Sequence, residues 1–108
     1  MALHHVEAGE VAQLSPLGDD LRNTRTYALV KTGRFEAVRL VIPAGTSIPE
    51  HAVEGPITLH CLEGKFALVR KRGQVTLHAC DWVHLEPGEP HALDGIEDAS
   101  VLVTIMFP

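Results

Sequence analysis

The stretch PAGTSIPEHAVEGPITLH, Pro43 to His60, places a histidine between two turn signals. Gly45 and the pair Gly55-Pro56 are typical of turns. From Ile57 onward apolar and polar residues alternate, as they do in a strand that buries one face. His51 therefore lies at the margin of a predicted β-structure, and the question it raises is whether it binds a metal ion there.

Short runs rich in β-branched residues recur along the chain, each followed by a turn signal. Glycines at 33, 45, 55, 64, 73, 88 and 95 separate the runs at intervals of about ten residues. Helical periodicity is weak, and only GEVAQLSPLGDDL (9–21) leaves room for one short helical turn. This spacing predicts an all-β sandwich or barrel. The runs are TYALVKTG (26–33), FEAVRLVIPAG (35–45), ITLHCLEG (57–64), KFALVRKRG (65–73), QVTLHACDWVHLEPG (74–88) and SVLVTIMFP (100–108).

Alternation within the runs assigns side chains to two faces, because successive strand residues point in opposite directions. The more apolar of the two faces is predicted to form the core. The other, more polar face carries His60, His78 and His84 together with Trp82, and we interpret it as a surface partly buried against another subunit. The predicted core residues are Val38, Leu40, Ile42, Leu59, Leu68, Leu77, Val83, Leu85, Val101, Val103 and Ile105.

Size and charge limit the classes of protein. The 108 residues predict one domain. The net charge of −5 and the pI near 5.7 disfavour binding to nucleic acid or to an anionic membrane. The basic run Arg70-Lys71-Arg72 precedes Gly73, and we interpret it as a solvated hairpin tip.

Neither a secretory signal nor a membrane-spanning segment is predicted. The first residues, MALHHVEAGEVAQL, lack a basic start and an apolar stretch, and the longest apolar run, 101–107, is far too short to cross a bilayer. Cys61 and Cys80 have no CxxC spacing and are expected to pack as small apolar side chains. The expected location is the cytoplasm.

The stretch from Thr26 to Phe107 contains two motifs that resemble those of the cupin superfamily. Members of this family are small double-stranded β-helix proteins. The first family motif is G-x5-H-x-H-x3-4-E-x6-G, to which Gly45, His51 and Gly64 correspond. The second is G-x5-P-x-G-x2-H-x3-N, to which Gly88 and His91 in PGEPH correspond. The resemblance implies an antiparallel jelly-roll barrel whose interior holds a small ligand.

The chain departs from both motifs at positions that bear on function. Val53 stands where the family has its second histidine, and Ile57 stands where it has the glutamate. In the second motif, Cys80, Glu86 and Gly95 replace glycine, proline and asparagine. Of the four metal ligands implied by the resemblance, only His51 and His91 are retained.

Two histidines leave three interpretations open. One is a reduced site for a divalent iron, manganese, zinc or nickel ion, although such sites usually have three protein ligands. Glu50 or Glu54 would supply a third ligand only if the loop bent, because alternation points both away from His51. Otherwise the pair belongs to a metal-free ligand pocket, or it has a purely structural role.

The sequence thus predicts one cupin-like domain over 1–108, with the barrel at 26–107 and an N-terminal segment, 1–25, packed on the barrel or on a dimer partner. The favoured function is binding of a small molecule in a mostly apolar pocket that contains His51 and His91. The alternative is a metal-dependent dioxygenase, isomerase or decarboxylase, so enzymatic activity stays open. A homodimer is expected. The other predicted pocket residues are Val53, Ile57, Leu59 and Cys61.

Overall fold

A computed structural model describes residues 5–108 of the chain. One short 3-10 helix, η1 (Gly18–Asn23), precedes seven strands, and every strand pairing is antiparallel. The sheet order is β1-β2-β7-β4-β5, with β3 also paired to β7 and β6 also paired to β4. The predicted all-β jelly roll is confirmed. The strands are β1 (Tyr27–Lys31), β2 (Phe35–Ile42), β3 (Ser47–His51), β4 (Ile57–Arg70), β5 (Gly73–His78), β6 (Trp82–Leu85) and β7 (His91–Met106).

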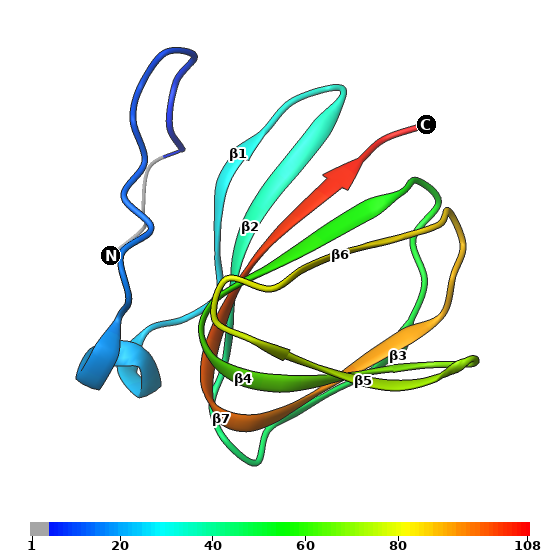
Figure 1. Ribbon diagram of the computed structural model, residues 1–108. Helices are drawn as coiled ribbons and strands as arrows, with labels where there is room; N and C mark the ends of the chain where they lie inside the picture. Colours follow the sequence, from blue (N-terminus) through cyan, green and yellow to red (C-terminus); the bar gives the residue numbers. More distant parts are fainter. Residues whose placement is uncertain (1–4) are drawn as a thin grey trace.

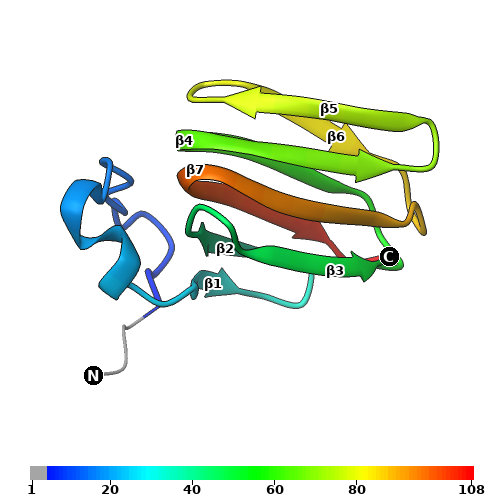
Figure 2. The same ribbon diagram turned by 90° about the horizontal axis from the view of Figure 1, so that it is seen from below.

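The two longest strands, β4 and β7, cross both layers of a sandwich (Figure 1). Residues 57–61 of β4 pair with β6 and with the end of β7, in the layer that also contains β1 and β2. Residues 65–70 of β4 pair with β5 and with the start of β7, in the layer that also contains β3. The β4–β5 and β6–β7 turns lie at one end of the sandwich, and η1 lies at the other (Figure 2).

Two glycines that we expected to end strands lie inside them instead. β4 runs through Gly64, so the predicted runs 57–64 and 65–73 form one strand, and β7 runs through Gly95. Gly64 has φ +76, and the register of β4 against β7 shifts around it. Here glycine permits a bulge that bends the strand from one layer into the other, because the left-handed conformation costs glycine little.

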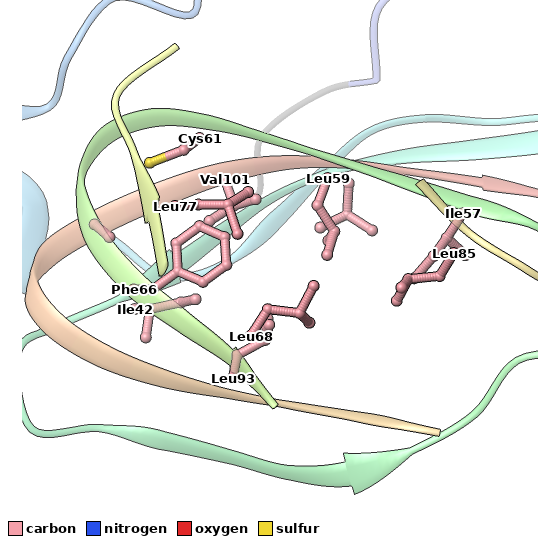
Figure 3. Close-up of a cluster of buried hydrophobic side chains, with 12 residues drawn as sticks. Ile42, Ile57, Leu59, Cys61, Phe66, Leu68, Leu77, Leu85, Leu93 and Val101 are labelled. Carbon is pink, nitrogen blue, oxygen red and sulfur yellow. The ribbon is translucent and has the colours of Figure 1, made fainter. Parts of the chain in front are cut away.

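Twelve buried side chains between the two layers form one hydrophobic cluster (Figure 3). Most of the predicted core residues belong to it, and Leu40, Val83 and Ile105 pack against it. Val38 is half-buried and lies outside the cluster. Alternation missed Phe66, Leu93 and Ala99, which lie next to the two glycine bends where the period of two is interrupted.

Part of the N-terminal segment contacts the outer face of the β1–β2–β7 layer. The Val6 amide donates to the Leu29 carbonyl at 2.8 Å, and Leu21 of η1 is buried. Beneath this segment Arg39 is only 2% exposed, although its side chain points away from the core. Its guanidinium donates to the Ser15 carbonyl at 2.7 Å and to Glu63 at 3.1 Å. The ion pair between Arg39 of β2 and Glu63 of β4 lies within the sheet, and the hydrogen bond to Ser15 joins the N-terminal segment to it.

The carboxylate of Glu63 is the centre of this contact. It accepts hydrogen bonds from the amides of Leu17 and Gly18 and from the hydroxyl of Ser100. Burial by itself raises the pKa of Glu63, but these hydrogen bonds and the charge of Arg39 outweigh it, so the pKa is lowered. Glu63 is therefore ionised in the folded protein at neutral pH.

Cys80 occupies a bulge position that glycine usually fills. Its φ is +77, its amide donates to the Cys61 carbonyl at 2.8 Å, and the Cys61 amide donates to the Asp81 carbonyl at 2.9 Å. This pattern is a G1 bulge, whose first residue adopts the left-handed conformation. The cupin motif has glycine at this position, so the departure noted in the sequence places a strained residue here.

We expect Cys80→Gly to raise the free energy of unfolding by about 1 kcal/mol, because it removes the left-handed strain. Urea unfolding of the reduced protein measures the change. Cys80→Ala is the control, since it removes the thiol and retains the Cβ, and it should leave stability near that of the parent. Equal gains in the two variants would mean that the thiol, rather than the backbone strain, limits stability.

Within residues 5–108, no helix combines the length and the apolar character that a membrane crossing requires.

Candidate binding site at the open end of the barrel

His51 and His91 come together at the end of the sandwich that carries the β4–β5 and β6–β7 turns. His51 is the last residue of β3 and His91 is the first residue of β7, and the two are partners in the β3–β7 pairing. Residues directly opposite each other in neighbouring strands share a face. Their ring centroids are accordingly 4.3 Å apart, with the rings tilted by 57°. The structure thus brings together the two histidines that the two motifs supply.

Both imidazoles are held in the same way by their own strands. Nδ1 of His51 lies 3.0 Å from the carbonyl of Pro49, and Nδ1 of His91 lies 3.0 Å from the carbonyl of Glu89. A carbonyl can only accept a hydrogen bond, so Nδ1 carries the proton in each neutral ring. Each Nε2 is therefore left with a lone pair for a hydrogen-bond donor or a metal ion.

The two rings differ in exposure. His51 is exposed, whereas His91 is only 2% exposed. Every buried side-chain nitrogen and oxygen in residues 5–108 has a hydrogen-bond partner. Within those residues Nε2 of His91 has no hydrogen-bond partner, and the atom keeps some contact with solvent. The pair thus consists of an exposed imidazole and an almost fully buried one beside it.

The other predicted pocket residues lie deeper or to one side. Ile57, Leu59 and Cys61 are buried members of the hydrophobic cluster, and burial raises the pKa of the Cys61 thiol to about 11. A protonated, packed thiol agrees with the inert role expected of Cys61. Val53 is half-buried, and its carbonyl accepts the Gly88 amide at 2.8 Å, which ties the loop after His51 to the loop before His91.

Neither His51 nor His91 lines the hollows that residues 5–108 form at the N-terminal segment, beside β1 and beside Val53. One of about 370 Å³ lies beside the site, between Val53, Glu36 and the C-terminal residues Phe107 and Pro108. One of about 400 Å³ lies between the N-terminal segment and β1. The two histidines lie at the end of the barrel, next to the buried hydrophobic cluster that fills the space between the layers.

The retained donors do not fit a complete protein metal site of the kind that the cupin resemblance implies. In residues 5–108, no three histidine, cysteine, aspartate or glutamate side chains are grouped so that they could hold a metal ion. Zinc and non-haem iron sites normally have at least three protein ligands. Val53 and Ile57, at the positions of the family's missing ligands, have no donor atoms. Glu50 and Glu54 are exposed.

Sequence reasoning missed Arg70 as a site residue. The basic run was assigned to a solvated hairpin tip, and it does lie at the β4–β5 turn. However, Arg70 is the partner of His91 in the β4–β7 pairing, so it stands in the same row as both histidines. The alternation of Phe66, Leu68 and Arg70 in β4 carried this information, but only the register between strands connects it to His91.

The residues predicted for one polar outer face are divided between the two layers. His60, Trp82 and His84 lie where β6 pairs with residues 57–61 of β4, whereas His78 lies on β5 in the layer that contains β3. His78 and His84 are exposed, His60 is half-buried, and Trp82 is 59% exposed. The Trp82 and His84 rings lie 5.9 Å apart. These residues are on strands β4 to β6 and take no part in the His51–His91 pair.

No protein-family model matches the chain, and no curated protein matches its sequence. Among solved structures, a conserved protein of unknown function from Streptococcus pyogenes is similar over 100% of this chain and 96% of its own, with 18% identity and a TM-score of 0.77. A cupin superfamily protein from Desulfitobacterium hafniense is similar over 77% of this chain and 76% of its own, with 18% identity and a TM-score of 0.74. An RmlC-like cupin from Desulfovibrio desulfuricans covers 98% and 96%, with 22% identity and a TM-score of 0.69. With the strand order and the paired histidines, these likenesses show that the chain has the fold of the cupin superfamily.

Proposed function

We propose that the protein binds a small polar molecule at the open end of the barrel, through Nε2 of His51 and Nε2 of His91. The observation that carries the proposal is the matched anchoring of the two rings. Each Nδ1 is used by a backbone carbonyl 3.0 Å away, and each Nε2 is left without a protein partner. Packing alone does not require two adjacent imidazoles that are oriented in this way, so we infer that they bind a ligand.

The chemistry of the two Nε2 atoms defines the class of ligand. In the neutral rings they accept hydrogen bonds, so a hydroxyl or amide of the ligand donates to them. When a ring is protonated, its Nε2–H donates to a carbonyl or carboxylate oxygen instead. The apolar side chains of Val53 and Ile57 near this end favour a ligand with a small hydrocarbon part.

Ligand-observed NMR with a set of small hydroxy, oxo and amide compounds tests this proposal. We expect His51→Ala and His91→Gln each to weaken the binding of any hit at least tenfold, because each removes one of the two contacts. His84→Ala is the control, since its ring is exposed on the outer face and should not matter. Hits that are insensitive to both site variants would overturn the proposal, and thermal unfolding shows that each variant is folded.

A metal-dependent enzyme of the dioxygenase, isomerase or decarboxylase type is the second candidate. The observation in its favour is that the two rings are adjacent and that neither Nε2 has a protein partner within residues 5–108, so a divalent ion could be bound by two imidazoles and solvent. Elemental analysis of untagged protein, before and after incubation with iron, manganese, zinc and nickel, decides between the candidates. Bound metal that disappears in His51→Ala would favour the enzyme, and persistently empty protein would exclude it.

Two expectations rest on the sequence and stay predictions. One is the homodimer, for which the exposed Trp82 and the histidines on its face are the candidate contact surface. The other is the location in the cytoplasm.

A further inference from the structure

We propose that Arg70 makes the His51–His91 site selective for a small carboxylate that carries a hydroxyl on the neighbouring carbon. This inference rests on the proposed function and adds the charge of the ligand to it. It follows from the placement of a guanidinium in the same row of the sheet as the two imidazoles.

The row is defined by the strand register. Arg70 of β4 pairs with His91 of β7, and His91 pairs with His51 of β3. One residue pair deeper, Leu68 lies opposite Leu93, and both belong to the hydrophobic cluster. Since side chains two residues apart share a face, Arg70 leaves β4 on the same side as Leu68, above the core. Arg70 and His91 therefore lie side by side on the inner face, at its open end.

The guanidinium of Arg70 has a hydrogen-bond partner at Nε and none at its two terminal amino groups within residues 5–108. Its Nε donates to the Gly73 carbonyl at 3.1 Å, across the β4–β5 turn. Within residues 5–108, its two terminal amino groups have no hydrogen-bond partner and no ion pair. Those amino groups are the part of the side chain that binds a carboxylate in a two-pronged contact.

Neighbouring acidic side chains do not neutralise Arg70 by direct contact. Glu89 lies near it, but Glu89 forms an ion pair with Arg72 at 2.7 Å and also accepts the Glu86 amide. The hydrogen bond from Arg72 is the main reason that the pKa of Glu89 is lowered, so this carboxylate is ionised and already paired. Glu50 and Glu54 are exposed, and within residues 5–108 neither forms an ion pair with Arg70.

The three groups together match one chemical pattern. Residues directly opposite each other in paired strands have Cα atoms about 5 Å apart, so one small molecule can reach an arginine and a histidine that are neighbours in a row. The guanidinium binds the carboxylate, and the hydroxyl on the next carbon donates to an imidazole Nε2. A neutral amide of the same shape would keep the second contact, but it offers the guanidinium one oxygen in place of two and no negative charge.

The test compares lactate with lactamide, which has the same hydroxyl and methyl groups but no charge. Titrations followed by NMR chemical shifts give both dissociation constants. We expect the protein to bind lactate at least tenfold more tightly than lactamide. Arg70→Gln should remove this preference, chiefly by weakening the binding of lactate. Arg70→Lys should retain only part of it, because an ammonium group lacks the two-pronged geometry.

Arg72→Gln is the matched control, because Arg72 lies on the same turn and carries the same charge but is paired with Glu89. It should keep the preference for lactate, whereas a general electrostatic effect would weaken both arginine variants alike. Equal binding of lactate and lactamide, absence of lactate binding, or an Arg70→Gln variant that still prefers lactate would each overturn the carboxylate proposal. If lactate and lactamide bind equally, loss of lactamide binding in His51→Ala would show that the proposed function survives. Binding that is insensitive to His51 and His91 would reject both the proposed function and the carboxylate proposal.

Discussion

Replacing Glu63 with glutamine should lower the free energy of unfolding by about 3 kcal/mol. The substitution leaves Arg39, which is 2% exposed, without its ionic partner, and Glu63 itself is only 13% exposed. It also weakens the acceptor for the Leu17 and Gly18 amides, so the N-terminal segment should become more sensitive to protease. Chemical denaturation and limited proteolysis measure the two effects.

Glu97→Gln is the control for this prediction, since Glu97 is exposed and its carboxylate takes part in no hydrogen bond or ion pair within residues 5–108. Its effect should fall within about 0.5 kcal/mol. The double variant Arg39→Met/Glu63→Met should be less destabilised than the sum of the two single variants, because it removes both charges from the buried site. Equal stabilities of Glu63→Gln and Glu97→Gln would contradict the central role of this ion pair.

The same carboxylate should make stability depend on pH in the acid range. The pKa of Glu63 is lower in the folded protein than its ordinary value of 4.5. Its contribution is therefore fully present above that value, and it is lost as the pH falls through the folded pKa. Below about pH 4.5 the parent protein should lose stability more steeply than Glu63→Gln. Parallel curves for the two proteins would show that other carboxylates dominate the acid transition.

Gly64→Ala should be the most damaging single substitution in the strands, with a loss on the order of 4 kcal/mol or failure to fold. The added Cβ would lie 2.0 Å from the carbonyl oxygen of Asp98, which is backbone and cannot move without displacing β7. The φ of +76 adds strain for any residue other than glycine. Expression level and thermal unfolding provide the measurement.

Gly33→Ala is the matched control for Gly64→Ala. Nothing lies within 4 Å of its added Cβ, and its φ is outside the left-handed region, so it should be neutral or slightly stabilising. A Gly64→Ala variant with the stability of Gly33→Ala would mean that β4 can bend between the two layers without glycine. A milder form of the test uses Gly95→Ala, whose Cβ would lie 2.4 Å from the Pro43 carbonyl oxygen.

The sequence predicted the jelly roll and most of its core because the signals involved are local. Alternation of apolar residues identifies a buried face wherever the strand is regular, as from Ile57 to Cys61. The prediction was wrong where glycine served a different purpose. Gly64 and Gly95 were assigned to turns between strands, whereas they lie at bends within them, and local sequence does not separate these two uses of glycine.

The candidate site was predictable only in part, for a similar reason. The motifs supplied His51 and His91, which do come together. Arg70 was placed at a solvated hairpin tip, and nothing in the sequence indicated that Arg39 is buried, because a single strand does not show what lies beside it. The register between β4 and β7 puts Arg70 next to His91, and the N-terminal segment covers Arg39. Both facts depend on residues that are far apart in the chain.

Because β4 and β7 each run through both layers of the sandwich, they also influence how the chain folds. Ile57 pairs with Ile105, and Arg70 pairs with His91, so the central contact of both layers joins segments separated by long loops of chain. Loop closure of this kind costs entropy before the contacts form, and proteins dominated by it fold slowly, over milliseconds to seconds. Neither layer has a central strand pair of its own, so a half-folded intermediate with one finished layer has little to stabilise it. We therefore expect both layers to form together in the slow step of folding.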